Sequence, residues 1–242
     1  MSHSNKWIAR TVAGLALAML PVTHAAADVV VAVSGPSAKT YPVGKKIGAS
    51  DKIVLQSGDT LTVLGANGTR VLRGSGTYVL ANAATNDRSN AYALITRQRS
   101  AQRVRTGAVR DVNGQPVTRP NLWYVDVRQA GPMCIADTSE VRLWRPVTAG
   151  EQLYAIGMDS KTAASKANFG DGDMITVWDL TQAPITDGST YVIAGGDGKP
   201  SEITFRVLDD VPDDAENLAA KLIEKGCMAQ LDVLTTALAQ AE

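Results

Sequence analysis

The spacing of apolar and polar residues changes along the chain and divides it into regions with different predicted structure. Between Asp28 and Leu80, short apolar runs alternate with turn residues. They predict five strands, at Val29–Val33, Ile53–Gln56, Thr60–Leu64, Thr69–Arg73 and Thr77–Leu80. The run Ile53–Leu55 is continuous and predicts a central strand, whereas Leu61–Val63 alternates and predicts a half-exposed one. The region therefore predicts a small antiparallel β domain over residues 28–80.

A second series of strand-like runs begins after residue 120 and predicts a β-sandwich over residues 121–208. Alternation places Trp123, Val125 and Val127 on one face of the first run. The tryptophans at 123, 144 and 178 lie beside aliphatic residues, which favours the core as their usual environment. The six runs are Leu122–Val127, Val141–Arg145, Leu153–Met158, Met174–Trp178, Ser189–Ala194 and Ile203–Leu208.

Helical spacing is found in the two remaining regions. In 81–120, Asn86 or Asp87 can cap a helix with Ala91, Leu94 and Ile95 on its apolar face, followed by a linker. Residues 209–242 read as an acidic hinge and a C-terminal helix that begins near Pro212 to Asp214. Gly226 breaks or kinks this helix. Its apolar stripe consists of Leu218, Leu222, Leu231, Leu234 and Leu238.

The first 27 residues have the three zones of a cleavable secretion signal. Lys6 and Arg10 are followed by an apolar stretch from Val12 to Val22 and by the small residues Ala25–Ala27. This stretch is too short to span a bilayer, which takes roughly 20 residues. We therefore expect residues 1–27 to be removed, a mature start at Asp28, and a periplasmic or secreted protein.

Composition and export together limit the chemistry. Hydrophobic residues make up 45% and charged residues 20% of the chain, which excludes wholesale disorder and a multi-spanning membrane protein. Both histidines, His3 and His24, lie in the predicted signal. The mature protein would have no histidine-dependent nucleophilic site and no histidine-ligated metal. Export also predicts that Cys134 and Cys227 form one disulfide, because a zinc site needs more ligands.

Region 81–120 is rich in arginine, both on the polar side of the predicted helix and in the linker. Seven arginines and a single acidic residue, Asp111, lie between Arg88 and Arg119. Arg97, Arg99, Arg103 and Arg105 form a candidate patch for an anionic partner, such as a lipid headgroup or an acidic glycan. A solvated inter-domain helix and loop is the simpler interpretation, and because export separates the protein from nucleic acid, we expect no nucleic-acid partner.

Part of the first domain resembles the FecR-type periplasmic domain. The resemblance rests on Tyr41–Gly44, Ile53–Leu61, Gly68–Leu72 and Gly74–Gly76, and its motifs are mostly glycines at turns. It implies an extracytoplasmic β domain of an envelope signalling protein. Members of that family normally carry a cytoplasmic segment and a retained membrane helix, neither of which this sequence shows.

The second domain resembles fibronectin type III and other immunoglobulin-like sandwiches near one strand. Leu180, Asp187–Tyr191 and Val192–Ile193 match the approach to a late strand in those folds. The resemblance implies that the Tyr191 hydroxyl bonds back to the backbone at a corner between strands. The predicted fold class is thus mainly β: a small antiparallel β domain, an immunoglobulin-like β-sandwich and a C-terminal helical tail.

Other candidate sites have simpler structural interpretations. Asp171–Asp173 lacks the regularly spaced oxygen ligands of a calcium loop, and a hairpin turn accounts for it. Gly195–Gly198 is not followed by the Lys-Ser/Thr of a phosphate loop, and a turn between strands accounts for it. We expect no metal and no cofactor. Trp144 and Arg145 are a candidate glycan contact, because an arginine beside an aromatic side chain suits an anionic sugar.

The sequence favours an exported, non-catalytic binding or scaffolding protein of the bacterial cell envelope, whose partner is an envelope protein or an anionic glycan or lipid. One alternative is a histidine-free glycan hydrolase that uses two carboxylates, since any Asp or Glu could serve in such a pair. The other is a periplasmic sensory component of a FecR-like signalling system.

Overall fold

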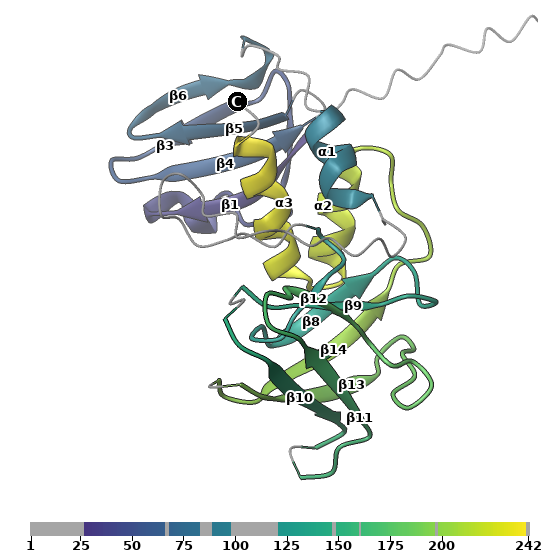
Figure 1. Ribbon diagram of the computed structural model, residues 1–242. Helices are drawn as coiled ribbons and strands as arrows, with labels where there is room; N and C mark the ends of the chain where they lie inside the picture. Colours follow the sequence, from purple (N-terminus) through teal and green to yellow (C-terminus); the bar gives the residue numbers. More distant parts are fainter. Residues whose placement is uncertain are drawn as a thin grey trace, which may run out of the picture.

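The fold is taken from a computed structural model of the 242-residue chain. The structure describes residues 27–65, 68–82, 89–97, 121–146, 149–159, 161–196 and 198–240. It is mainly β, with two sheet-containing units and a helical layer that lies against the N-terminal one (Figure 1). Within the described residues, no helix is long and apolar enough to cross a membrane. The predicted signal, residues 1–27, lies outside them except for Ala27, the first residue of a strand.

The N-terminal unit is an antiparallel four-stranded sheet with a two-stranded sheet beside it. The larger sheet has the order β2 (Lys46–Gly48), β1 (Ala27–Ser34), β4 (Thr60–Gly65), β5 (Gly68–Arg73). The smaller sheet pairs β3 (Lys52–Leu55) with β6 (Gly76–Val79), and the short helices η1 (Pro36–Lys39) and η2 (Leu80–Asn82) connect strands. One core joins the two sheets: Val30, Tyr41, Ile47, Ile53, Leu55, Leu61, Val63 and Leu80.

One of the two exposure predictions for this unit is wrong. The continuous run Ile53–Leu55, predicted to be central, forms β3 in the two-stranded sheet, where Val54 is 57% exposed. The alternating run Leu61–Val63 forms β4, in which Leu61 and Val63 are buried and Thr62 is partly exposed, as predicted, although β4 is hydrogen-bonded on both sides, to β1 and to β5. The prediction for β3 was wrong because a strand's pairing partners, and not its apolar content alone, decide whether it lies inside a sheet.

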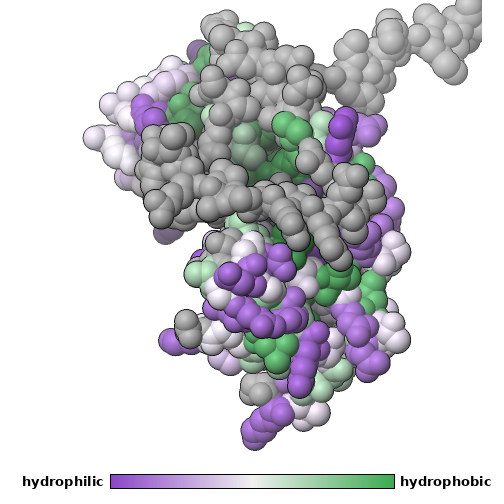
Figure 2. Space-filling model, in the orientation of Figure 1, coloured by the Kyte–Doolittle hydropathy of each residue, from purple (hydrophilic) through white to green (hydrophobic). Residues whose placement is uncertain are grey.

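The C-terminal unit consists of two sheets packed on one core. The five-stranded sheet has the order β11 (Ser165–Phe169), β10 (Gln152–Gly157), β13 (Thr190–Gly195), β14 (Ser201–Val207), β8 (Gly131–Ile135). The three-stranded sheet has the order β12 (Ile175–Val177), β9 (Arg142–Trp144), β7 (Val125–Asp126). On the side of this unit seen in Figure 2, hydrophilic residues surround smaller hydrophobic patches.

Both sheets contribute side chains to the sandwich core. Phe169, Tyr191 and Phe205 come from the five-stranded sheet, and Leu143 from the three-stranded sheet. Trp178, which follows β12, packs edge-on against Tyr191 and Phe205 with ring centroids 5.3 Å apart in each case. The Tyr191 hydroxyl donates to the Pro184 carbonyl at 2.6 Å, which confirms the predicted bond to the backbone.

Sequence patterns missed two strands of the sandwich. The strand β8 begins with Gly131 and Pro132, and β11 alternates small or polar residues with only one large apolar residue, Phe169. Asp171–Asp173 forms a turn, as predicted, but not a hairpin, because β11 before it and β12 after it belong to different sheets. The glycines Gly195 and Gly196 do lie in a hairpin, between the antiparallel strands β13 and β14.

The helical layer comprises α1 (Ser89–Thr96), α2 (Ala215–Glu224) and α3 (Met228–Gln240). Helix α2 packs on β1 and β4, whereas α3 contacts β5 of the N-terminal unit and β8 of the sandwich. Val29 and Val31 of β1 face this layer, while Val30 between them faces the N-terminal core. The C-terminal helices thus cover the outer face of the first sheet and also reach the second unit (Figure 1).

Local signals at the helix ends are largely confirmed. Asp214 caps α2 by accepting a hydrogen bond from the Asn217 amide at 2.8 Å. Gly226, with a φ of 76°, separates α2 from α3, so the tail is two helices. In α1, Ile95 is buried as predicted, but Leu94 is 58% exposed, which corrects its assignment to the apolar face. Asn86 and Asp87 lie outside the described residues.

Candidate functional site: the junction between the two β units

The end of α1 is held by the first described residues of the sandwich unit. Three donors meet consecutive carbonyls: the Leu122 amide bonds Ile95 at 3.0 Å, the Trp123 indole bonds Thr96 at 2.7 Å, and the Asn121 side chain bonds Arg97 at 2.6 Å. The last carbonyls of a helix have no partner within it and need such donors. Asn121, Leu122 and Trp123 are all buried, so this cap is shielded from water.

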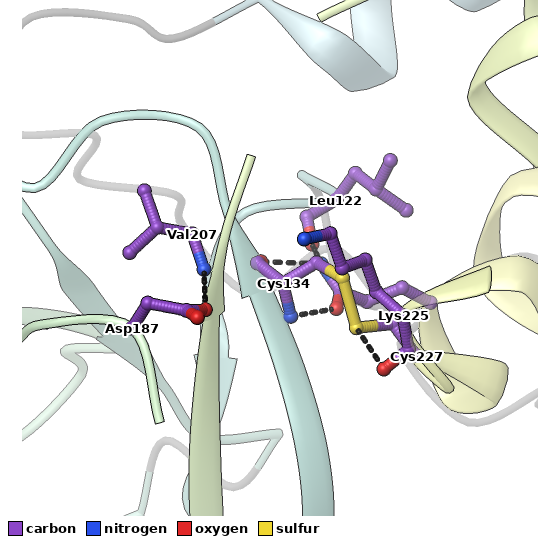
Figure 3. Close-up of a disulfide and its surroundings, with 7 residues drawn as sticks. Leu122, Cys134, Asp187, Val207, Lys225 and Cys227 are labelled. Atoms are coloured by element: carbon purple, nitrogen blue, oxygen red, sulfur yellow. Dashed lines mark hydrogen bonds between the residues drawn. A yellow bond between two sulfur atoms is a disulfide. The ribbon is translucent and has the colours of Figure 1, made fainter. Parts of the chain in front are cut away.

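A disulfide, shown in Figure 3, and a glutamine side chain fasten the same region to α3. Cys134 on β8 and Cys227, just before α3, form the predicted disulfide, with Cα atoms 5.9 Å apart. One helical turn later, the Gln230 side chain accepts from the Cys134 amide at 2.6 Å and donates to the Cys134 carbonyl at 2.9 Å. It also donates to the Leu122 carbonyl at 2.9 Å.

Gln230 therefore acts like one residue of an additional strand at the edge of the five-stranded sheet. β14 occupies one side of β8, and Gln230 satisfies both backbone groups of Cys134. Its side chain is 0% exposed, so these bonds form where water cannot replace them. Sequence reasoning missed this residue, and its signal is a polar position on the leucine stripe three residues after Cys227.

Negative charge gathers on the α2 side of the junction. The Tyr92 hydroxyl of α1 donates to the Pro212 carbonyl. Burial, with smaller contributions from the carboxylates of Asp214 and Asp213, raises the pKa of Tyr92 to about 12. Its hydroxyl therefore stays protonated and remains a hydrogen-bond donor at neutral pH.

A second charged group lies at the start of β1. Asp28, 6% exposed, forms an ion pair with Arg70 at 2.6 Å. Burial raises the pKa of Asp28, and the Arg70 guanidinium partly opposes it. Burial also raises the pKa of Glu216 in α2, and the carboxylates of Asp28 and Asp214 add to that effect, while Lys46 opposes it. The two carboxyl groups thus repel each other across the contact between β1 and α2.

The candidate anionic-partner patch begins at this junction. Arg97 is exposed at the end of α1, whereas Arg99, Arg103 and Arg105 lie outside the described residues. The residues that flank the undescribed stretch, Arg97 and Asn121, are hydrogen-bonded to each other. The two described residues that flank the arginine-rich stretch are therefore neighbours in space, and both take part in the hydrogen bonds at the end of α1.

The structure places Trp144 and Arg145 in the interior, 2% and 1% exposed. Leu143 points into the sandwich core, so Trp144 lies on the opposite face of β9, where the Arg128 guanidinium lies 5.8 Å from the centre of its ring. Arg145 donates to the carbonyls of Asp173 at 2.7 Å, Gly170 at 2.8 Å and Gly150 at 2.9 Å. Neither side chain offers a glycan a surface here, and Arg145 instead holds loops of the sandwich together.

The acidic sequences serve as turn and cap residues. The Asp171 carboxylate accepts from the Gly150 amide at 2.7 Å, and Asp214 caps α2. Within the part of the chain that the structure describes, no group of three or more acidic, cysteine or histidine side chains is placed to hold a metal ion.

Comparisons with known proteins add no relative. No protein-family model matches the chain, and neither a curated protein nor a solved structure matches it.

Proposed function

We propose that this protein is an exported, non-catalytic binding module of the bacterial cell envelope that engages an anionic partner through Arg97, Arg99, Arg103 and Arg105. The observation that supports this most is the bond between Asn121 and Arg97, which joins the two flanks of the arginine-rich stretch. Holding both flanks of a binding segment reduces the conformational entropy that is lost when a partner orders it.

The junction beneath these flanks suits such a role. Asn121 is followed by Leu122, which is bonded to Gln230, and Gln230 is one helical turn from the disulfide at Cys227. The flanks of the arginine-rich stretch are therefore attached, through α3, to both β units. Functional segments are commonly positioned by a rigid scaffold, and here the described residues on both flanks of the arginine-rich stretch belong to one.

A binding assay with anionic vesicles tests the proposal. The mature protein is mixed with vesicles of phosphatidylglycerol and phosphatidylcholine, or of phosphatidylcholine alone, and the sedimented fraction is measured over a salt series. Each basic residue near an anionic surface contributes about 1 kcal/mol. Replacing the four arginines by glutamine should weaken binding by about two to three orders of magnitude, and salt should weaken binding of the parent protein.

A matched variant controls for net charge. Lys52, Arg73, Lys161 and Lys199 are exposed and distant in sequence from the patch, and their replacement by glutamine removes the same charge. This variant should bind nearly as well as the parent protein. Equal losses in both variants would show that overall charge, and not the patch, drives binding. No binding to the anionic vesicles would exclude a lipid partner, and the same variants would then be tested on a sulfated polysaccharide.

Export is tested by the mass of the protein from an extracytoplasmic fraction. The order of cationic, apolar and small residues predicts Asp28 as the first residue. An intact Met1 on most molecules would contradict export and would also return both histidines to the mature chain.

A further inference from the structure

The outer face of the five-stranded sheet has an apolar centre. On β10, Tyr154 and Ile156 point into the sandwich core, so Leu153 and Ala155 point outward. On β13, Tyr191 and Ile193 point inward, so Val192 and Ala194 point outward, and the register places Ala194 beside Ala155. Leu153 is 52% exposed, and the other three residues are half-buried.

Charged residues flank this centre on opposite sides. The register places Lys166 of β11 next to Ala155, and Glu202 of β14 next to Val192. Both side chains are exposed, and neither forms an ion pair with another residue in the described part of the chain. The sheet thus has a cationic residue on β11 and an anionic residue on β14, with four apolar residues on the two strands between them.

Such a face is unusual for a sheet that only meets water. An antiparallel sheet with one solvated face normally alternates hydrophobic residues inside with polar residues outside. Here β10 and β13 carry apolar residues on both faces over this length. Contiguous exposed apolar surface rimmed by polar residues is typical of interaction sites. The strands concerned lie side by side, at the end of the molecule away from the helical layer (Figure 1).

We propose that this face binds a second copy of the same chain, related by a two-fold axis roughly parallel to the strands. That operation lays β10 of one copy over β13 of the other and β11 over β14. It brings Lys166 of each copy toward Glu202 of the other copy, which forms the same pair twice. In this arrangement the backbone of Lys166 in one copy and that of Glu202 in the other are offset by one outward-facing position along the strands, about 7 Å. Extended lysine and glutamate side chains span this offset.

The shape of the surface agrees with the same pairing. Ala155 and Ala194 at its centre are small and let the two sheets approach closely. Leu153 projects from β10 toward the region of the other copy where β13 ends in Gly195 and Gly196. The face ends at Gly157, where a Cβ atom would lie 2.0 Å from the Thr162 carbonyl of the adjoining loop.

The size of the contact predicts a weak dimer. Four strands spaced about 4.8 Å apart and about 20 Å long offer a patch of roughly 300 Å² for each copy. This is below the range of permanent complexes, so the association should depend on concentration. The proposal is independent of the anionic-partner proposal, because none of its residues belongs to the arginine patch.

Sedimentation velocity on the mature protein tests this pairing, from micromolar to near-millimolar concentration. We expect the sedimentation coefficient to rise with concentration toward that of a dimer. Leu153→Arg should weaken the association at least tenfold. Val177→Arg is the control, because Val177 is similarly exposed, at 56%, but lies on β12 of the other sheet. It should leave the dimer unchanged.

Charge exchange tests the orientation without touching the apolar centre. Lys166→Glu and Glu202→Lys should each weaken the dimer, because like charges then face each other. The double variant should restore it, because the pair is rebuilt with its signs reversed. A protein that stays monomeric throughout, a dimer that survives Leu153→Arg, or a double variant that fails to restore association would each overturn the proposal.

Discussion

Replacing Gln230 with leucine should destabilise the protein, because three buried backbone groups lose their hydrogen-bond partner. The substitution keeps the volume and adds apolar surface, worth about 1–2 kcal/mol when it is buried. It also removes the partners of the Cys134 amide, the Cys134 carbonyl and the Leu122 carbonyl, all inside the molecule. Each unsatisfied buried group costs about 1–3 kcal/mol, with carbonyls toward the lower end.

The free energy of unfolding should therefore fall by about 2–4 kcal/mol, a large part of the roughly 5–15 kcal/mol that stabilises a typical domain. Urea unfolding of the oxidised protein, followed by tryptophan fluorescence, measures it. Gln182→Leu is the control, because Gln182 is exposed and the same change there should have little effect. A loss below about 1 kcal/mol for Gln230→Leu would refute the reasoning, since the three bonds would then be replaceable by relaxation.

Three further predictions concern the same elements. Cys227→Ser opens a loop that spans 93 positions and should lower stability by about 4–5 kcal/mol in the chain-entropy model, with α3 becoming sensitive to protease; alkylation of both thiols in the folded parent protein would contradict the bond. Trp123→Phe removes the indole donor to Thr96 and should speed amide exchange in α1 with a loss of about 1 kcal/mol, and unchanged exchange there would disprove the cap. Glu216 has a raised pKa in the folded state, so its contribution is complete at low pH and is lost as pH rises through that pKa. Glu216→Gln should therefore raise the melting temperature at pH 7 and lose this advantage below its ordinary pKa of 4.5; a lower melting temperature at pH 7 would mean that the helix dipole outweighs the repulsion.

Patterns along the chain were sufficient where a structure depends on neighbours in sequence. The strand β5 and the helix cap at Asp214 are set by turn residues and local hydrogen bonds, and their bounds lie within about a residue of prediction. The expectation of export was enough to predict that the only two cysteines of the chain are paired, and the disulfide confirms that pairing. In these cases the deciding interaction is either local in sequence or, for the two cysteines, allows only one possible pairing.

Patterns failed where the deciding interaction comes from a distant segment. Val54 is exposed because β3 pairs with a single strand, β6, and nothing within Ile53–Leu55 records that arrangement. Gln230 is bonded to residues 96 and 108 positions away. Trp144 and Arg145 stand next to each other in sequence and are both buried, but Trp144 ends β9 beside Arg128, whereas Arg145 follows β9 and lies 5.1 Å from the centre of the Phe169 ring. Adjacency in sequence therefore could not show whether they share a surface.

The packing of β1 against α2 has a consequence for the order in which the protein can be built. Val29 and Val31 belong to the first strand of the described chain, yet the residues that bury them, Leu218 and Leu222, are synthesised more than 180 positions later. Until those helices emerge, one face of the first sheet has no cover, although its other face can already pack against Ile53 and Leu55 of β3. Contacts this distant in sequence form late, because a long loop must close before they gain any energy. During synthesis, the N-terminal unit should therefore be a half-finished sheet that holdase chaperones can recognise, and a stop codon before Ala215 would leave it in that state permanently.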